Sequence, residues 1–428
     1  MGSQLLGGVA TAAAVGGMSA GPALALRPAV FAAVEGLSLL VGLLLQALMM
    51  RALGPAGYGG YALACALGLV AMTVTDFGFN FSGVTRAIEV AHDPDAAHRH
   101  FWAVQSTKAF AAIATGVIAW GWALWAGDAQ ARMIAWAMTV GALAAWCLPS
   151  WFLFSRQKVI LLACGLLASR VLCLIAMLLI VEGAAQIGSA IFLTLGAPLI
   201  AAPMMLSSPA VRAQMRPRWP GAVALGVATR SGLSTLWLSA QVVVSAAVLQ
   251  SLLFSLTSST PLGVFAAADR VRGGVQGLFA AFGVAAFPRL VQLGVDRNVI
   301  GQDRAWPLLR LQLLVAVAAA LLVFFLAPWI VSVVLGAQFQ ASVPVLRVLA
   351  LALISSTFFT AIGVQVMLPR SMARQYTFAT LALLALQSAA LVVLAPAAGA
   401  VGAAWAVVLS ESIVAASVFM LVVRRKPP

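Results

Sequence analysis

Charged residues are scarce in this chain. Asp, Glu, Lys and Arg make up 8% of its 428 residues, whereas 63% are hydrophobic and the mean hydropathy is +1.05. A soluble protein of this length could not cover its surface with so few charges, so that class is excluded. Apolar runs of about 20 residues recur from end to end and predict an all-α, polytopic integral membrane protein.

Acidic residues are even scarcer than basic ones: the chain has 11 Asp and Glu against 25 Lys and Arg, and its formal net charge is +14. In a soluble protein this excess would suggest nucleic acid. Here the basic residues are spread over short loops without a basic face or an aromatic-basic array, so nucleic acid is excluded as a partner.

Side chains with metal-ligand or redox spacing are also lacking. The four cysteines fall inside apolar runs and are interpreted as small core residues. His92, His98 and His100 share one loop with Asp93 and Asp95, but no helical spacing supports a metal site, and the loop is interpreted as a solvated surface. The sequence therefore predicts no metal and no cofactor.

The apolar runs divide into twelve predicted membrane spans, bounded mostly by Pro, Gly and charged residues. The predicted spans are 29–50, 59–84, 101–126, 133–154, 159–181, 187–206, 228–256, 262–288, 307–334, 344–367, 376–395 and 400–423. Trp120, Trp122 and Trp125 near one end of the third span, and Trp151 with Phe152 near the end of the fourth, suit interfacial aromatic belts.

The basic residues predict the orientation of these spans. If the N-terminus is cytoplasmic, 17 basic residues lie inside and the outside loops hold only Arg51 and Arg132. Those inside are Arg27, Arg86, Arg99, Arg156, Lys158, Arg212, Arg216, Arg218, Arg289, Arg297, Arg304, Arg310, Arg370, Arg374, Arg424, Arg425 and Lys426. This bias predicts that both termini are cytoplasmic and that the number of spans is even.

The longest polar connection in the middle, residues 207–221, divides the spans into six and six. The predicted organisation is a cytoplasmic tail (1–28), an N-lobe (29–206), a cytoplasmic linker (207–221), a C-lobe (222–423) and a cytoplasmic tail (424–428). Sliding one half over the other by 204 residues aligns 45–64 with 249–268 without a gap and matches Gln46 to Gln250 and Gly59 to Gly263. The match favours an internal repeat, which is a transporter architecture.

Several stretches resemble the Wzx-type polysaccharide flippases. The most specific is "TDFGFNFSGVTRAIEV" (75–90), similar to the signature of their second helix. The others are "RALGPAGYGGYALA" (51–64), "LGVFAAADRVRGGVQGLFAAFGVAAFPRL" (262–290), "LRVLALALISSTFFTAIGVQVMLP" (346–369) and "GAVGAAWAVVLSE" (399–411). Ala56 departs from the pattern, because that position is often acidic in the family.

This resemblance covers most of residues 30–423 and implies a member of the multidrug/oligosaccharidyl-lipid/polysaccharide (MOP) exporter superfamily. Two six-helix lobes, as in MATE transporters, would then enclose a cavity that opens alternately to either side of the bacterial cytoplasmic (inner) membrane. The implied substrate is an oligosaccharide linked to undecaprenyl diphosphate, used for O-antigen, capsule or exopolysaccharide. Membrane lipids and other polysaccharide assembly proteins are the further implied partners.

Six basic residues fall within the predicted spans, where a charge costs about 3 kcal/mol on insertion scales. They are Lys108, Arg170, Arg230, Arg270, Arg272 and Arg347. Such residues usually face a cavity or a partner, and an excess of them predicts a positive cavity that suits a diphosphate, because Arg can grip two phosphate oxygens at once. The predicted substrate-binding set is Arg270, Arg272, Arg230, Arg170 and Lys108, with Arg86 and Arg51 nearer the membrane surfaces.

The eighth span is the richest in polar residues. Asp269, Arg272 and Gln276 share one helical face by their spacing, and Arg270 points about 100° away from Asp269. Gly273, Gly274 and Gly277 are expected to allow close helix approach or a local distortion. A cavity role is favoured, and the alternative is that Asp269 and Arg272 neutralise each other as a structural pair.

Four further polar residues are candidates for cavity lining or proton coupling. Asp76 and Asn80 lie four apart and are expected on one face of the second helix. Glu35 and Glu411 either exchange protons or pair with a buried Arg, and the structural role is favoured. Arg86 is either the first cytoplasmic contact of the diphosphate or an ordinary positive-inside anchor.

Three alternatives remain beside the flippase. A MATE-like multidrug exporter would want an anionic cavity for a cationic drug, and lipid II flippases often carry extra helices beyond twelve. A membrane polymerase or ligase of polysaccharide needs a sizeable outside loop, yet every outside loop here is about a dozen residues or shorter. No phosphate-binding glycine loop or catalytic pair of acids appears either, so a transporter and not an enzyme is predicted.

Overall fold

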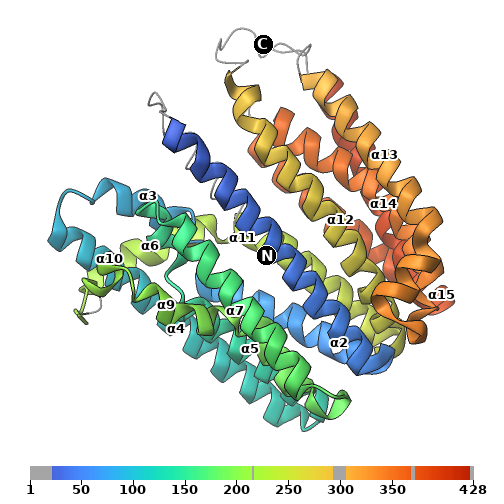
Figure 1. Cartoon of the computed structure of the whole chain (residues 1–428), viewed down its shortest axis with the longest axis horizontal. Coiled ribbons are helices and arrows are strands. Elements are labelled where there is room, and N and C mark those ends of the chain that lie inside the picture. The colour runs from blue at the N-terminus through green and yellow to red at the C-terminus, as the bar shows by residue number, and fades with distance from the viewer. Residues whose placement is uncertain (1–21, 215, 293–304, 368–371, 425–428) are drawn as a thin grey trace. The chain divides into compact units, whose positions relative to one another are not determined.

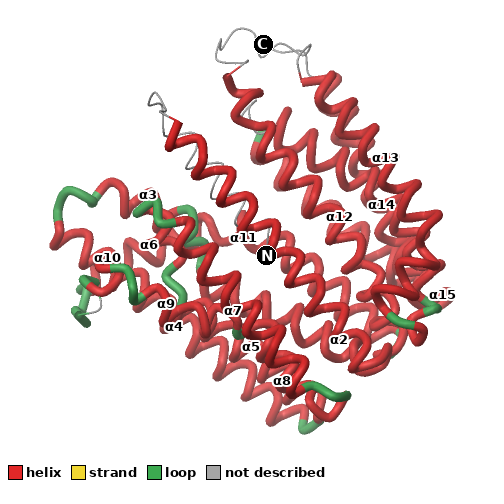
Figure 2. Tube along the Cα trace, in the orientation of Figure 1, coloured by secondary structure: helices red, strands yellow, loops and turns green. Residues whose placement is uncertain are grey.

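The computed structural model describes residues 22–214, 216–292, 305–367 and 372–424, and within these ranges the secondary structure is helical, without a strand (Figures 1 and 2). The predictions for most of the N-terminal tail and for eight basic residues lie outside the described side chains; these residues are Arg27, Arg289, Arg297, Arg304, Arg370, Arg424, Arg425 and Lys426. The first helix begins at Pro22, earlier than the predicted residue 29.

The elements up to the middle of the chain follow the predicted spans with some breaks. They are α2 (Pro22–Asp76), α3 (Ser82–Glu89), α4 (Pro94–Ala126), α5 (Ala129–Cys147), α6 (Ser150–Ser155), α7 (Val159–Ile180), η1 (Ala184–Gln186), α8 (Ile187–Leu195), α9 (Ala197–Met205), α10 (Pro209–Arg212) and α11 (Ala222–Leu256). The fourth predicted span is broken between α5 and α6, and the sixth is bent by 40° between α8 and α9.

The remaining elements are α12 (Ser259–Gln292), α13 (Ala305–Ile330), η2 (Val331–Leu335), η3 (Ala337–Phe339), α14 (Ser342–Ile362), η4 (Gly363–Met367) and α15 (Ala373–Arg424). Two short π-helical turns, η2 and η4, extend α13 and α14. Pro328 stands inside α13 and Pro396 inside α15, near the ends of predicted spans.

Eight helices in the described residues are long and apolar enough to cross a membrane, or nine if the bent α8–α9 pair is one span. Two of the eight, 44 and 50 residues long, are each about twice the length that a crossing needs. Each contains one glycine with positive φ, Gly54 at 66° and Gly399 at 54°, at a predicted boundary between spans. Counting each as two spans makes about twelve plausible.

The chain forms two compact units. One contains residues up to Ala52 together with Tyr61–Ala247, and the other contains Leu53–Gly60 together with the chain from Val248 onward. The predicted lobe and linker boundaries stay a prediction.

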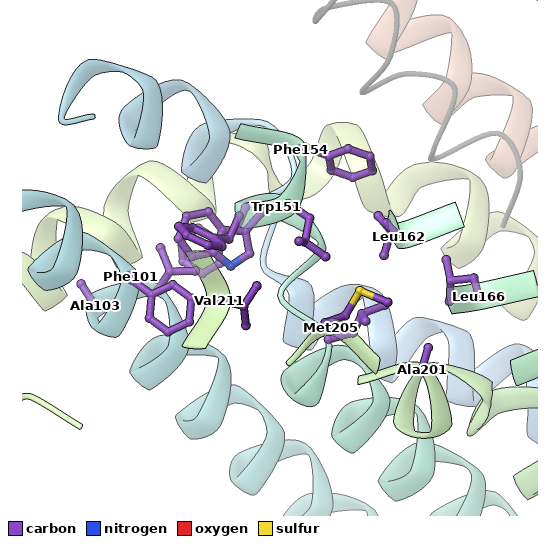
Figure 3. Packing of buried hydrophobic residues seen from close by; sticks show 14 of the residues in the cluster. Phe101, Ala103, Trp151, Phe154, Leu162, Leu166, Ala201, Met205 and Val211 are labelled. Carbon is purple, nitrogen blue, oxygen red and sulfur yellow. The ribbon is translucent and has the colours of Figure 1, made fainter. Parts of the chain in front are cut away.

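An aromatic core holds the first unit at the ends of its helices (Figure 3). Trp151 and Phe152 of α6 are 0% and 3% exposed, and their ring centroids lie 5.8 Å and 5.2 Å from that of Phe101 of α4, in a tilted and an edge-to-face arrangement. The prediction that Trp151 and Phe152 belong to an interfacial belt is therefore wrong. The α5–α6 break turns them inward, whereas Trp125 is 86% exposed, as a belt residue should be.

The predicted histidine loop is also partly helical. Because α4 begins at Pro94, with Asp93 as its N-cap, His98 and His100 lie on this helix. His100 Nε2 donates to the Gly83 carbonyl at 3.1 Å, and His98 Nε2 donates to the Arg216 carbonyl at 3.1 Å. The interpretation of this segment as a solvated surface is thus wrong for these two residues. His98 attaches the 207–221 connection to α4 through the Arg216 carbonyl.

In the second unit α14 packs against α12, α13 and α15 (Figure 1). The beginning of α12 crosses the α2 segment of this unit at two glycines. A Cβ on Gly59 would lie 1.8 Å from the Ser259 carbonyl oxygen, and a Cβ on Gly263 would lie 1.8 Å from that of Pro55. Only glycine fits such a crossing.

This crossing is reciprocal and has the offset of the predicted repeat. Gly59 and Gly263 are 204 residues apart, as are their contact residues Pro55 and Ser259. A Cβ added to either glycine would also lie close to the backbone nitrogen of the other, at 2.9 Å for Gly59 and 3.0 Å for Gly263. A contact that maps onto itself under the sequence offset is what two copies of one motif make when they meet about a two-fold axis.

Candidate functional site

A buried ion pair lies in the first unit. Lys108 of α4, whose side chain is 0% exposed, donates from Nζ to Asp76 Oδ1 at 3.0 Å and toward the Leu148 carbonyl at 3.5 Å. Asp76 is the last residue of α2, and Leu148 lies in the break between α5 and α6. The pair therefore ties the middle of α4 to the end of α2 and to the break between α5 and α6. A lone ammonium at this depth would be very costly.

A sharp turn after Asp76 shapes this site. Phe77 and Gly78 have φ of 53° and 75°, so the helix cannot continue. A Cβ on Gly78 would lie 2.6 Å from Thr235 Oγ1 and 2.8 Å from the Leu236 backbone nitrogen, so glycine is required. The predicted second span, which ran to residue 84, thus ends early.

Asn80 belongs to the same network, although not by helical spacing. Its side-chain amide donates to Asp76 Oδ2, and Ser150 Oγ donates to Asn80 Oδ1 at 3.0 Å. The expectation that Asp76 and Asn80 share one face of a helix is wrong, because Asn80 lies beyond the helix end. The turn nevertheless brings the two side chains together.

Arg170 of α7 is held differently. Its Nη1 donates to the Ser38 carbonyl at 3.1 Å and to the Ser38 hydroxyl. Glu35, one turn earlier on α2, attracts it electrostatically, but no carboxylate of the described residues lies within ion-pair distance. Arg170 is half-buried, so it presents a guanidinium held by a neutral partner inside an apolar span.

The other cations predicted for this half of the chain are exposed. Arg86 pairs with Glu89 at 2.7 Å on α3, with both side chains more than half exposed. Arg230 on α11 and Arg51 on α2 are exposed as well. The pairing of Arg86 with Glu89 leaves both of its predicted roles open.

A second charged cluster joins α12, α14 and α15 in the second unit. Arg272 Nε donates to Asp269 Oδ1 at 2.8 Å, and its Nη1 donates to Glu411 Oε1 at 3.2 Å and to Ser356 Oγ at 3.3 Å. Glu411 Oε2 accepts from Ser356 Oγ at 2.5 Å and from Ser355 Oγ at 3.2 Å. Each carboxylate thus takes a different nitrogen of one guanidinium.

The charge of this cluster does not cancel. One guanidinium and two carboxylates give a formal charge of −1, and the side chains of Arg272 and Glu411 are only 14% and 12% exposed. Arg270 is exposed and Gln276 is half-buried on the same helix. The predicted close approach at Gly273 and Gly277 is wrong, since a Cβ at either position would meet nothing within 4 Å.

The structure therefore groups the predicted residues into two networks, Asp76–Lys108–Asn80 and Asp269–Arg272–Glu411, with Arg170 near Glu35. The prediction that they line one cationic cavity stays a prediction. Sequence reasoning missed the hydroxyls of Ser38, Ser150, Ser355 and Ser356, which complete these networks. The only signal available was the "SS" pair within an apolar span.

Comparisons with known proteins extend these observations. No model of a known protein family matches the sequence. A protein of Escherichia coli (strain K12) described as "Putative O-antigen transporter" is 22% identical over 352 residues, which are 81% of this chain and 84% of that protein.

Two solved structures are similar over nearly the whole chain. An inward-facing multidrug resistance transporter of the MATE family of the MOP superfamily has a TM-score of 0.65 at 12% identity, covering 98% of this chain and 97% of its own. The lipid II flippase MurJ in an inward closed conformation has a TM-score of 0.72 at 14% identity, covering 93% and 88%. The predicted fold class, an all-α polytopic membrane protein with a MATE-like fold, is confirmed.

Proposed function

We propose that this multi-pass transporter of the MOP superfamily, a protein of the bacterial inner membrane and not an enzyme, flips lipid-linked oligosaccharides. The proposed cargo is an oligosaccharide on undecaprenyl diphosphate, moved from the cytoplasmic to the periplasmic leaflet for assembly of a surface polysaccharide. The proposed mechanism is alternating access through a cavity between two lobes. The relative described as an O-antigen transporter supports this substrate class.

The observation that carries the proposal is the guanidinium of Arg170. It is kept inside an apolar span, and its hydrogen bonds go to the neutral residue Ser38. A charge retained there at a cost of about 3 kcal/mol, with no carboxylate of the described residues within ion-pair distance, fits an anionic ligand that arrives from outside. The two phosphates of a diphosphate match the planar, two-pronged donor geometry of Arg.

The remaining predicted residues have supporting roles in this proposal. Arg230 and Arg270 would extend the positive surface along the path, and Arg272 would contribute only after releasing one of its two carboxylates. Arg86 and Arg51 would contact the diphosphate near the two membrane surfaces. Lys108 is already paired with Asp76. Its contribution would be to hold the end of α2 and the break between α5 and α6 in place. An inside-negative potential would favour outward movement of such an anion by about 2.3 kcal/mol per charge per 100 mV.

A deletion strain tests the proposed function in cells. We expect loss of the surface polysaccharide, with its lipid-linked precursor retained in the cytoplasmic leaflet, and restoration of both by the wild-type gene. A multidrug exporter would give the opposite result, increased drug susceptibility with normal polysaccharide, and that result would refute the proposal.

Variants of Arg170 test the residue on which the proposed function rests. Arg170→Ala should abolish complementation, whereas Arg170→Lys keeps the charge but loses the fork and should restore it only in part. Arg132→Ala is the matched control, because Arg132 is exposed and its Nη1 makes only a long contact, 3.4 Å, to the Gly127 carbonyl among the described residues. If Arg170→Ala inserts and complements as well as Arg132→Ala, Arg170 does not bind the substrate.

A further inference from the structure

The Arg272 cluster is built so that an incoming anion must compete for it. A guanidinium offers two edges at which a pair of donors can grip phosphate or carboxylate oxygens. Asp269 already takes Nε on one edge, and Glu411 takes Nη1 on the other. No two-donor edge of Arg272 is therefore open to a diphosphate while both carboxylates stay bound.

We propose that Glu411 is an internal counter-ion of Arg272 that a polyprenyl diphosphate displaces, and that the displaced Glu411 takes up one proton from water. This inference rests on the proposed function and deepens it. Glu411 is the partner to leave, since it comes from a different helix, α15, and its contact with Arg272 is the longer one, 3.2 Å against 2.8 Å for Asp269. Asp269 lies one turn from Arg272 on the same helix and would stay.

The groups around Glu411 explain why it would take up a proton when Arg272 leaves. Among the hydrogen bonds of the described residues, Arg272 reaches it from α12, and the hydroxyls of Ser355 and Ser356 reach it from α14. Asp269 lies on the other side of the shared Arg272 guanidinium. Arg347, the charged residue of α14, lies instead over the ring of Phe324, 5.6 Å from its centroid. Once Arg272 turns to the diphosphate, Glu411 keeps two hydroxyl donors and loses the one cation with which the described residues show it paired.

A carboxylate left in that position is a nearly buried anion beside Asp269 and an arriving diphosphate. Protonation removes this charge and converts one carboxylate oxygen into a hydroxyl donor. The balance is simple: one proton moves from bulk water to Glu411, and no bond other than its O–H forms. Release of the diphosphate would return Glu411 to Arg272 and the proton to water. The cluster would thereby exchange one anion for another without leaving Arg272 uncompensated.

Binding of farnesyl diphosphate, a short polyprenyl diphosphate, to the purified full-length transporter tests this exchange. Calorimetry in buffers of different ionisation heat measures the protons taken up per ligand bound. For wild type we expect uptake approaching one proton per ligand, with affinity falling by up to about tenfold per pH unit as pH rises through the range in which this uptake is measured. Glu411→Gln cannot take up this proton, so its affinity should be higher and lack this pH slope.

Glu182→Gln is the matched control, because Glu182 is an exposed acid in a loop, and it should keep the wild-type slope. Wild-type binding without proton uptake would overturn the inference while leaving the proposed function intact. This outcome is measured on the wild-type protein alone, so it does not depend on whether a variant folds. Equal affinity and equal slope in wild type and Glu411→Gln would overturn it as well. Failure of every protein to bind the diphosphate would instead refute the proposed substrate class, and the exchange with it.

Discussion

At the scale of single residues, the charged side chains inside the spans differ in the partner that compensates their charge. Lys108 is fully buried and matched one-to-one by Asp76, and Arg272 is shared by two carboxylates. Arg170 has, in the part of the chain that the structure describes, the neutral Ser38 as its hydrogen-bond partner. A fully matched buried pair specifies structure, because breaking it strands a charge. An unmatched one is better explained by a ligand. These three environments assign different roles to residues that the sequence presents alike.

Lys108→Ala should therefore destabilise the protein. Removal of the ammonium leaves Asp76 without its cation, and breaking a buried pair in this way costs about 3–5 kcal/mol. Arg86→Ala is the control, since its pair with Glu89 is exposed and such pairs contribute about 0–1 kcal/mol. Equilibrium unfolding in mixed micelles measures both, and equal midpoints for the two variants would show that the Lys108–Asp76 pair does not stabilise the fold.

At the scale of helices, the crossing of Gly59 and Gly263 is the tightest constraint in the second unit. Either added Cβ would overlap a carbonyl oxygen of the facing backbone at 1.8 Å, a distance that no rotamer change can relieve. The helices would have to separate. Because the contact is reciprocal, the two glycines should respond alike, which is a test of the repeat as well as of the packing.

Gly59→Ala and Gly263→Ala should each lower the unfolding free energy by about 1–3 kcal/mol, the usual cost of overpacking. Gly116→Ala is the matched control in α4, because a Cβ there meets nothing within 4 Å. In that helix the substitution should be neutral or stabilise by up to about 1 kcal/mol. Thermal unfolding of the three variants in one detergent measures the difference, and similar stability of all three would contradict the close crossing.

Much of the helical order was predictable from hydropathy, but the interruptions were not. The helix ends at Asp76 because Phe77 and Gly78 adopt positive φ against Thr235, a contact 157 residues away that no local pattern shows. The break before Ser150 turns Trp151 inward, although an aromatic pair near a span end is typical of an interface. In both places long-range packing overrides the local signal.

Most contacts of the candidate site likewise depend on long-range packing and not on local sequence. The Asp269–Arg272 pair was predictable, because three residues along a helix bring the two side chains together. Lys108 and Asp76 are 32 residues apart and Arg272 and Glu411 are 139 apart, so their pairing depends on how whole helices pack. The serines that complete both networks carry no charge, and serine also occurs in apolar spans without such contacts. Their role could therefore not be predicted from the sequence.

At the scale of the whole molecule, the orientation in the membrane rests on the distribution of basic residues. The predicted topology puts the linker and the C-terminus on the side that carries 17 of those bases. Reporter tags inserted in the 207–221 linker and after Arg425 should both be cytoplasmic, as measured by their accessibility in intact cells and in permeabilised ones. A periplasmic signal from either tag would contradict the even number of spans.

The central claim concerns the cargo, and transfer in proteoliposomes tests it most directly. Purified wild-type protein is reconstituted in vesicles that carry a labelled undecaprenyl-diphosphate oligosaccharide, and the label reaching the opposite leaflet is followed with time. We predict transfer well above that of protein-free vesicles, reduced to background by Arg170→Ala and unaffected by Arg132→Ala. Transfer by the wild-type protein no faster than in protein-free vesicles would contradict the account.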